Sequence, residues 1–283
     1  MRSHGDQNRP RQRGGVLVSD RGGDGPLALC LHGFPDTAHT WRHLLPELAG
    51  RGYRAVAPFT RGYAPTEIPA DAAYEGAALA ADVLALHEEL GGDERAVLVG
   101  HDWGAFPAYA VADRFRAAVT MAVPPPAALL AGLMDYDQLK RSFYVFLFQT
   151  PLAESAAATP GFLDRLWQDW SPGYDASDDL AFVRRSIGEL ANLAAAIGYY
   201  RAMMGTTPPS GRYPDPGRAE STPILYLHGD RDGCLTPDVV KQALPHLPPG
   251  SRAELVPGAG HFLHLERPDV VNRLVLDWLA AVP

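Results

Sequence analysis

Our fold prediction for this chain starts from one stretch, Ala96-Val97-Leu98-Val99-Gly100-His101-Asp102-Trp103-Gly104. Its first four residues are apolar without alternation, as in a parallel strand covered by helices on both faces. The pattern Gly-x-Asp-x-Gly is typical of a sharp strand-to-helix turn, in which the middle residue has a strained backbone and flanking glycines allow close approach. We therefore predict Asp102 at the end of a strand and the start of a helix, where the dipole favours an anion. A structural capping aspartate is the alternative for this pentapeptide alone.

Similar apolar runs lie on both sides of this stretch and alternate with helical patterns. They cover residues 27–31, 53–58, 117–123, 224–228 and 252–256, and residues 16–18 predict an antiparallel edge strand. Apolar residues spaced at i, i+3, i+4 and i+7 predict helices over 41–48 and 79–90, and a similar pattern predicts a closing helix over 270–278. Strands that alternate with helices indicate an α/β fold with a mostly parallel sheet.

The alternation is interrupted once, between about Pro124 and Gly217. Aromatic and alanine-rich helical segments lie there between two proline-rich boundaries. We interpret residues 125–217 as a helical cap inserted into an α/β core of residues 15–124 and 218–283. Residues 1–14, with four arginines and no apolar run, are expected to form a flexible arm and no secretory signal.

Composition excludes several classes of protein. The chain has 283 residues, 46% of them hydrophobic, which is typical of globular proteins, and its net charge of −8 argues against a nucleic-acid partner. Cys30 and Cys234 have no metal-binding spacing, so we expect free thiols, a reducing cytoplasm and no metal. No apolar run reaches about 18 residues, so no membrane span is predicted. Homo-oligomerisation stays open.

Two further polar residues follow predicted strands. His261 comes after the last strand in a glycine-rich loop, and Asp232 follows the strand before it, with Asp230 as its rival. Open α/β sheets place their sites at the carboxyl ends of the strands, so Asp102, Asp232 and His261 are expected to meet. The turn His32-Gly33-Phe34-Pro35 ends another strand, and we expect the backbone N–H groups of Phe34 and Trp103 to form an oxyanion hole.

These motifs give the chain its resemblance to a known family. His-Gly-Phe-Pro, Gly-His-Asp-Trp-Gly and the terminal Gly-His resemble those of the α/β-hydrolase superfamily, and within it the epoxide hydrolases and the related haloalkane dehalogenases. The resemblance covers residues 16–282 and implies an eight-stranded sheet with a helical cap. It implies Asp102 as nucleophile, His261 as general base and Asp232 as the orienting acid. Residues 58–66 depart from the family pattern, which puts the substrate's shape in doubt.

The resemblance extends into the predicted cap. Residues 142–151 resemble the epoxide hydrolase segment that carries the first ring-opening tyrosine, which selects Tyr144. Tyr199-Tyr200-Arg201 resembles the segment that carries the second, which selects Tyr200, with Tyr199 as its rival. Ordinary cap aromatics are the alternative for each. Phe34, Trp103, Phe148 and Met204 are expected to line an apolar substrate pocket.

The residue types indicate a reaction. A carboxylate that attacks a tetrahedral carbon forms an alkyl ester on the enzyme, and a His–Asp pair can activate the water that hydrolyses it. We therefore expect a hydrolase that opens a small hydrophobic epoxide to a vicinal diol without a cofactor. A haloalkane dehalogenase with the same nucleophile is the nearest alternative. A small-molecule binding protein without turnover is the alternative from another class.

Overall fold

A single sheet organises the part of the chain that the computed structural model describes, residues 11–13, 16–20 and 24–283. Its eight strands follow the order β1-β2-β4-β3-β5-β6-β7-β8. The six strands from β4 to β8 in this order run parallel, whereas β1 and β2 are antiparallel to their neighbours. The strands are β1 (Arg11–Arg13), β2 (Val16–Asp20), β3 (Leu27–Leu31), β4 (Arg54–Pro58), β5 (Val97–His101), β6 (Ala117–Met121), β7 (Ile224–Gly229) and β8 (Arg252–Val256).

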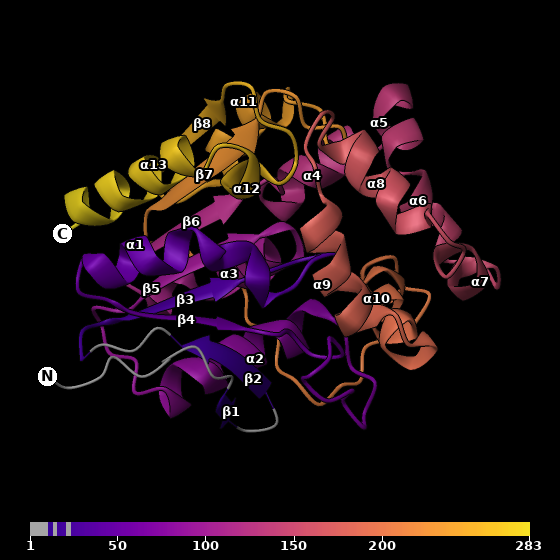
Figure 1. Cartoon of the computed structure of the whole chain (residues 1–283). Helices are drawn as coiled ribbons and strands as arrows, with labels where there is room; N and C mark the ends of the chain where they lie inside the picture. The colour runs from indigo at the N-terminus through magenta and orange to yellow at the C-terminus, as the bar shows by residue number, and fades with distance from the viewer. Residues whose placement is uncertain (1–10, 14–15, 21–23) are drawn as a thin grey trace, which may run out of the picture.

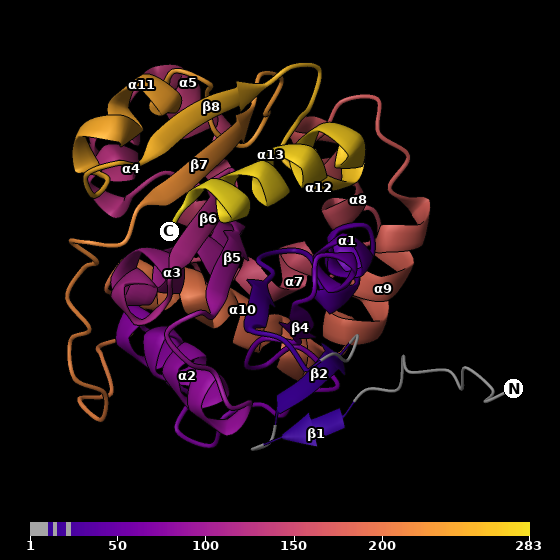
Figure 2. The same ribbon diagram turned by 90° about the vertical axis from the view of Figure 1, so that its left-hand side faces the viewer.

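Alternate residues of a strand point to opposite faces of the sheet, and in the central strands the residues on both faces are mostly apolar and buried, so helices cover both faces. Ala28 and Cys30 of β3 pack in one core cluster with α1 (Leu44–Gly50) and α13 (Pro268–Ala281). Leu29 and its alternate neighbours pack in a second cluster with α2 (Gly76–Glu89) and α3 (Ala105–Val111). Figure 2 shows α1 and α13 on one side of the strands and α2 and α3 on the other. The amphipathic patterns over 41–48, 79–90 and 270–278 correspond to these helices and to a short 3-10 helix before α1, η1 (Ala38–Arg42).

The pairing register brings the loops of the site together. Leu31 of β3 pairs with Gly100 of β5, so the chain leaves both strands at the same edge of the sheet. His228 pairs with Leu255 in the same way, which aligns the loops after β7 and β8. The predicted residues of the triad and of the oxyanion hole all follow these four strands.

The insert between β6 and β7 consists of seven α-helices. The helices are α4 (Pro126–Gly132), α5 (Tyr136–Arg141), α6 (Phe143–Leu147), α7 (Ala153–Ala157), α8 (Phe162–Trp170), α9 (Ser177–Ile187) and α10 (Leu190–Met203). In Figure 1, α5 to α10 gather on the side opposite the C-terminus, whereas α4 lies beside the sheet and contacts α11 (Val239–Ala243). Trp167 attaches the insert to the core. Its Nε1–H donates to the Pro35 carbonyl at 2.9 Å, and its ring stacks on that of Phe262 with 3.4 Å between the ring centroids.

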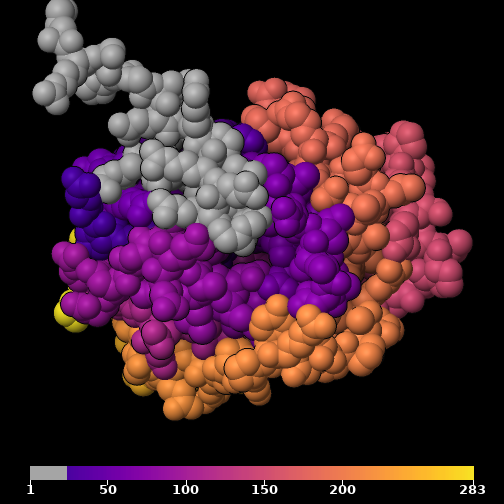
Figure 3. Space-filling view, turned by 90° about the horizontal axis from the view of Figure 1, so that it is seen from below, coloured from indigo at the N-terminus to yellow at the C-terminus, as the bar shows by residue number. Residues whose placement is uncertain are grey.

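The segment that returns from α10 to β7 follows the surface of the core. In Figure 3 this orange segment lies beside the purple residues around the start of α2. Ser210 N–H donates to the Glu75 carboxylate at 3.1 Å, and the Tyr213 hydroxyl donates to Asp71 Oδ2 at 3.1 Å. These bonds attach the return segment to the residues before α2.

The first residues of the chain differ from the prediction. β2 is antiparallel as expected, but β1 lies outside it, so residues 16–18 do not form the edge. The arm expected over residues 1–14 is wrong for Arg11–Arg13, because these residues pair with β2 through their backbones, which an apolar pattern cannot reveal. Residues 1–10 and 14 of the arm lie outside the described residues. Across the described ranges, no helix is both long and apolar enough to cross a membrane.

Candidate active site

Asp102 occupies the sharp turn that the sequence predicts after β5. Its φ angle is +52°, a left-handed conformation that costs energy for a residue with a side chain. The flanking glycines are needed for steric reasons: a Cβ on Gly100 would lie 2.2 Å from the Gly104 carbonyl oxygen, and one on Gly104 would lie 2.2 Å from that of Leu31. At this turn the backbones of β5, β3 and the short 3-10 helix η2 (Asp102–Gly104) are in close contact, which fixes the position of the Asp102 carboxylate.

The loop after β3 contacts this carboxylate from the other side. The backbone N–H of Phe34 donates to Asp102 Oδ1 at 2.7 Å. A Cβ on Gly33 would lie 2.2 Å from the same oxygen and 2.5 Å from the Trp103 nitrogen, so only glycine allows this approach. The Phe34–Pro35 peptide bond is cis. The loop thus brings one N–H donor onto Asp102 and runs next to the backbone nitrogen of Trp103, the second predicted donor.

His261 lies between the two buried carboxylates. Its Nδ1 is 3.0 Å from Asp232 Oδ2, and its Nε2 is 3.5 Å from Asp102 Oδ2. Asp232 Oδ1 accepts the backbone N–H groups of Cys234 and Leu235 at 2.7 and 3.0 Å, which fixes this carboxylate. Asp230, the rival of Asp232, is exposed and accepts the Gly258 N–H instead. The structure therefore brings together the three residues that the sequence predicts.

The charges of these groups stabilise one another. Burial by itself lowers the pKa of His261, but Asp232 and Asp102 outweigh this effect and raise the pKa to about 10. Burial raises the pKa of each carboxyl, yet the adjacent His261 outweighs it, and the pKa values of Asp102 and Asp232 are both below their usual value. The site therefore holds a cationic imidazole between two carboxylates.

Asp102 faces a small apolar cavity of about 80 Å³ beneath the helical insert. Tyr144 and Tyr200 form its roof, with ring centroids 5.5 Å apart. The Tyr200 hydroxyl is buried and donates to no described residue, although the Trp103 side chain acts on it as a donor. The Tyr144 hydroxyl lies 3.4 Å from Cys234 Sγ. The cavity is lined by Asp102, Trp103, Phe106, Val123, Leu129, Leu130, Leu133, Ser142, Tyr144, Val145, Tyr200, Met203, Met204, Cys234 and Leu235.

The other predicted pocket residues take different places. Trp103 and Met204 lie in the cavity wall as expected. Phe34 and Phe148 lie one layer behind it, where their rings pack against Tyr200 at 5.3 and 5.2 Å. Tyr199, the rival of Tyr200, turns away and donates its hydroxyl proton to the Arg61 carbonyl at 2.8 Å. Adjacent helical residues point about 100° apart, so only one of the two tyrosines faces the cavity.

Comparison with known proteins identifies the family. A family model for the alpha/beta hydrolase fold matches residues 26–268. The chain belongs to the α/β-hydrolase family. It is 34% identical to epoxide hydrolase 3 of Xenopus tropicalis, over 90% of this chain and 71% of that protein. It is 30% identical to epoxide hydrolase A of Mycobacterium tuberculosis, over 91% of both chains. The crystal structure of a Bacillus megaterium epoxide hydrolase with an inhibitor is 26% identical, with a TM-score of 0.78 over 96% of this chain and all of that one.

These findings confirm the predicted fold class and the resemblance to epoxide hydrolases. The parallel sheet with a helical insert is that of an α/β-hydrolase, and the relatives named above cover most of both chains. The chain is an α/β-hydrolase that resembles epoxide hydrolases over about 90% of its length.

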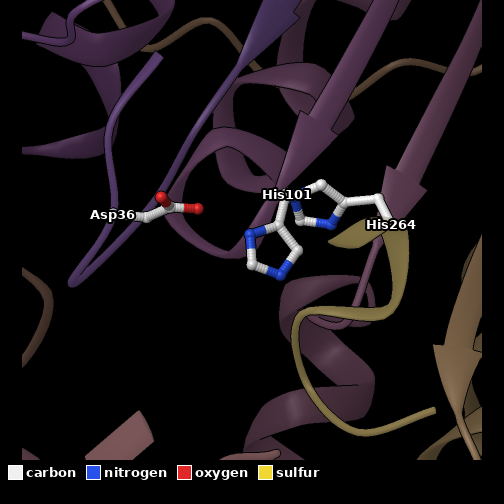
Figure 4. A group of neighbouring side chains, drawn as sticks. All are labelled: Asp36, His101 and His264. Atoms are coloured by element: carbon white, nitrogen blue, oxygen red, sulfur yellow. The ribbon is translucent and has the colours of Figure 1, made fainter. Parts of the chain in front are cut away.

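Behind Asp102, this hydrolase has a second buried polar cluster that we did not predict. Figure 4 shows Asp36, His101 and His264 close together, from the loop after β3, the end of β5 and α12 (Leu263–Glu266). His101 Nε2 lies 3.0 Å from the carbonyl oxygen of His261, which can only accept, so we assign the proton to Nε2. Its Nδ1 and Asp36 Oδ2 have no partner among the described residues. The sequence offered one signal for this cluster: Asp36 directly follows the His-Gly-Phe-Pro motif, and His101 lies within Gly-His-Asp-Trp-Gly.

Two groups of described residues have the composition of a metal site. Ligand atoms of Asp36, His101 and His264 lie within 4.8 Å of one another, as do those of Asp232, Cys234 and His261. In the first group, the Thr40 hydroxyl already lies 2.5 Å from His264 Nε2. Burial raises the pKa of Asp36 to about 8 and lowers that of His101 to about 3, so at neutral pH Asp36 is a protonated acid beside neutral histidines. This set of hydrogen bonds fits a neutral polar network better than a cation site.

Proposed function

We propose that this α/β-hydrolase opens epoxides to vicinal diols through an ester on Asp102. One observation carries the proposal: the Asp102 carboxylate and two buried phenols, Tyr144 and Tyr200, line the same apolar cavity. An epoxide held there would have its carbon at the carboxylate and its oxygen at the phenols. The epoxide hydrolases among its relatives support this choice of substrate. The helices of residues 125–217, which carry both phenols, would act as the cap domain on a core of residues 15–124 and 218–283.

The first step is displacement at carbon. Asp102 Oδ1 accepts the Phe34 N–H, so Oδ2 is the oxygen that we assign to the attack. Its bond to the epoxide carbon forms while the carbon–oxygen bond of the ring breaks. The alkoxide that leaves needs a proton, which a phenol at neutral pH can donate. Burial is the largest cause that raises the pKa of both phenols, and the negative charge of Asp102 acts in the same direction, which keeps them protonated before reaction.

The second step is hydrolysis of the ester. Ester formation removes the negative charge of Asp102, one of the two charges that raise the pKa of His261. The pKa of the imidazole falls, so its proton can pass to the phenolate left by ring opening. The neutral imidazole then takes a proton from water that attacks the Asp102 carbonyl carbon. Asp232 holds the imidazole through Nδ1, and the Phe34 and Trp103 N–H groups are assigned to the oxyanion that develops on Oδ1. As this intermediate collapses, the imidazolium protonates the departing oxygen and the diol leaves. The Asp102 carboxyl then returns a proton to His261, which restores the carboxylate.

Halide displacement is the main competing function, because it would use the same nucleophile. A halide leaves without a proton, so the two phenols in the same cavity as Asp102 favour an epoxide. The test compares wild type with the Tyr144→Phe and Tyr200→Phe double variant on panels of terminal epoxides and 1-haloalkanes. We expect diol from wild type only and no halide release. Halide release without diol would establish a dehalogenase, and tight binding without either product would indicate a binding protein.

A further inference from the structure

Cys234 contacts both the triad and the roof of the cavity. Its backbone N–H donates to Asp232 Oδ1 at 2.7 Å, and its Sγ lies 3.4 Å from the Tyr144 hydroxyl oxygen. The side chain is 2% exposed and lines the same cavity as Asp102. One residue therefore fixes the orienting carboxylate through its backbone and touches a proposed proton donor through its side chain.

The backbone around Cys234 leaves the thiol little freedom to move. Gln138 Nε2–H donates to the Cys234 carbonyl at 2.9 Å. The preceding Gly233 donates its N–H to the Trp170 carbonyl at 3.0 Å, and a Cβ on this glycine would lie 1.8 Å from the Asp169 carbonyl oxygen. The loop is thus pressed against α8. The distance between the thiol and Tyr144 is set by packing rather than by a flexible side chain.

The two phenols of the roof are unequal because of this thiol. The buried Tyr200 hydroxyl accepts from the Trp103 side chain but donates to no described residue, so its proton is free to turn to a substrate oxygen. The Tyr144 hydroxyl is engaged by sulfur, which is both a weak donor and a weak acceptor. Burial and the charge of Asp232 raise the pKa of the Cys234 thiol, so it stays neutral and does not compete with Asp102 as a nucleophile.

We infer that Cys234 is a positioning residue for Tyr144, which it holds toward the epoxide oxygen and supports during ring opening. The inference rests on the proposed function. Before substrate binds, the phenol donates its proton to sulfur, a bond weak enough to exchange at little cost. When the epoxide opens, the phenol proton turns to the alkoxide, and the S–H group donates to the phenol oxygen, where negative charge develops. No bond to sulfur forms or breaks apart from this hydrogen bond.

The test is a double-mutant cycle on the rate of ester formation. The variants Cys234→Ala, Tyr144→Phe and both together are made in a His261→Gln chain, so that the ester accumulates and is counted by rapid-quench mass spectrometry. We expect Cys234→Ala to slow ester formation about fivefold to tenfold and Cys234→Ser to restore it, since a hydroxyl can also accept and donate. In the Tyr144→Phe background, Cys234→Ala should change the rate less than about twofold.

Controls separate positioning from packing. Cys30→Ala removes another buried thiol, in β3 and away from the cavity, and should leave ester formation unchanged. Equal losses with tyrosine and with phenylalanine at position 144, or no rescue by serine, would assign Cys234 a purely structural role and overturn the inference. Absence of ester in the His261→Gln parent itself, with every epoxide tried, would instead overturn the proposed function and this inference with it.

Discussion

Asp36→Asn tests the polar cluster behind the site through its effect on stability. Asp36 is 2% exposed; its Oδ1 accepts the Thr37 N–H at 2.7 Å, and its Oδ2 has no partner among the described residues. Burial raises the pKa of this carboxyl from 3.8 to about 8. Between these two values the folded protein retains a proton that the unfolded chain releases. The free energy of unfolding therefore falls as pH rises through this window and levels off above the folded pKa.

The size of the effect follows from the same shift. Each unit of pH between the two pKa values costs the wild type about 1.4 kcal/mol. Raising the pH from 6 past the folded pKa of about 8 therefore removes roughly 2–3 kcal/mol from wild type. The Asp36→Asn variant does not lose this stability, because an amide cannot ionise. The amide keeps an acceptor for the Thr37 N–H and offers its own N–H to the unpaired Nδ1 of His101.

The assay is urea denaturation of wild type and Asp36→Asn at pH 6 and pH 9. We expect the variant's stability relative to wild type to improve by roughly 2–3 kcal/mol between the two pH values. Asp230→Asn, a change at an exposed carboxyl, is the matched control and should show no such trend. If the stability difference between Asp36→Asn and wild type stays constant within about 0.5 kcal/mol, or changes in the opposite direction, Asp36 does not retain a proton in the folded protein.

Three further predictions concern the site itself. In single-turnover kinetics, Tyr200→Phe should slow ester formation at least about tenfold, while Tyr199→Phe should keep the rate within about threefold. In urea denaturation, Tyr199→Phe should lose about 1 kcal/mol of stability, because its hydrogen bond to the Arg61 carbonyl is lost. Gly33→Ala should lower kcat by about a hundredfold or more, because its Cβ would lie 2.2 Å from Asp102 Oδ1, whereas Gly50→Ala, with nothing within 4 Å, should leave kcat unchanged. Asp232→Asn should slow ester hydrolysis by about a hundredfold or more and ester formation much less, while Asp230→Asn should leave both rates as in wild type. Intact-protein mass spectrometry after mixing with substrate measures both rates.

The sequence predicts the sheet well where a strand is buried on both faces. The runs over 27–31 and 224–228 match β3 and β7 to within a residue, because a continuous apolar run with turn residues at its ends leaves little choice of boundary. The turn around Asp102 is predicted for a steric reason, and the glycine distances bear it out. β1 escapes prediction, because Arg11–Arg13 joins the sheet through backbone hydrogen bonds rather than through apolar side chains.

The site residues were predictable where they directly follow a buried strand. Asp232 and His261 meet Asp102 because the parallel register aligns the ends of β5, β7 and β8. Side chains placed by packing between distant segments were not predictable. Phe148 lies behind Tyr200 rather than in the cavity wall, and Cys234, expected to be only a buried thiol, contacts Tyr144 from 90 residues away.

Intact-protein and peptide mass spectrometry of a His261→Gln variant, incubated with an epoxide that wild type converts to diol, tests whether Asp102 is the nucleophile. The glutamine removes the proposed base, so the ester should form and hydrolyse slowly. We expect a mass increase equal to the whole epoxide, located on the peptide that contains Asp102 and absent from an Asp102→Ala, His261→Gln chain. An unmodified Asp102 peptide while wild type produces diol, or an adduct on another residue, would show that Asp102 is not the nucleophile.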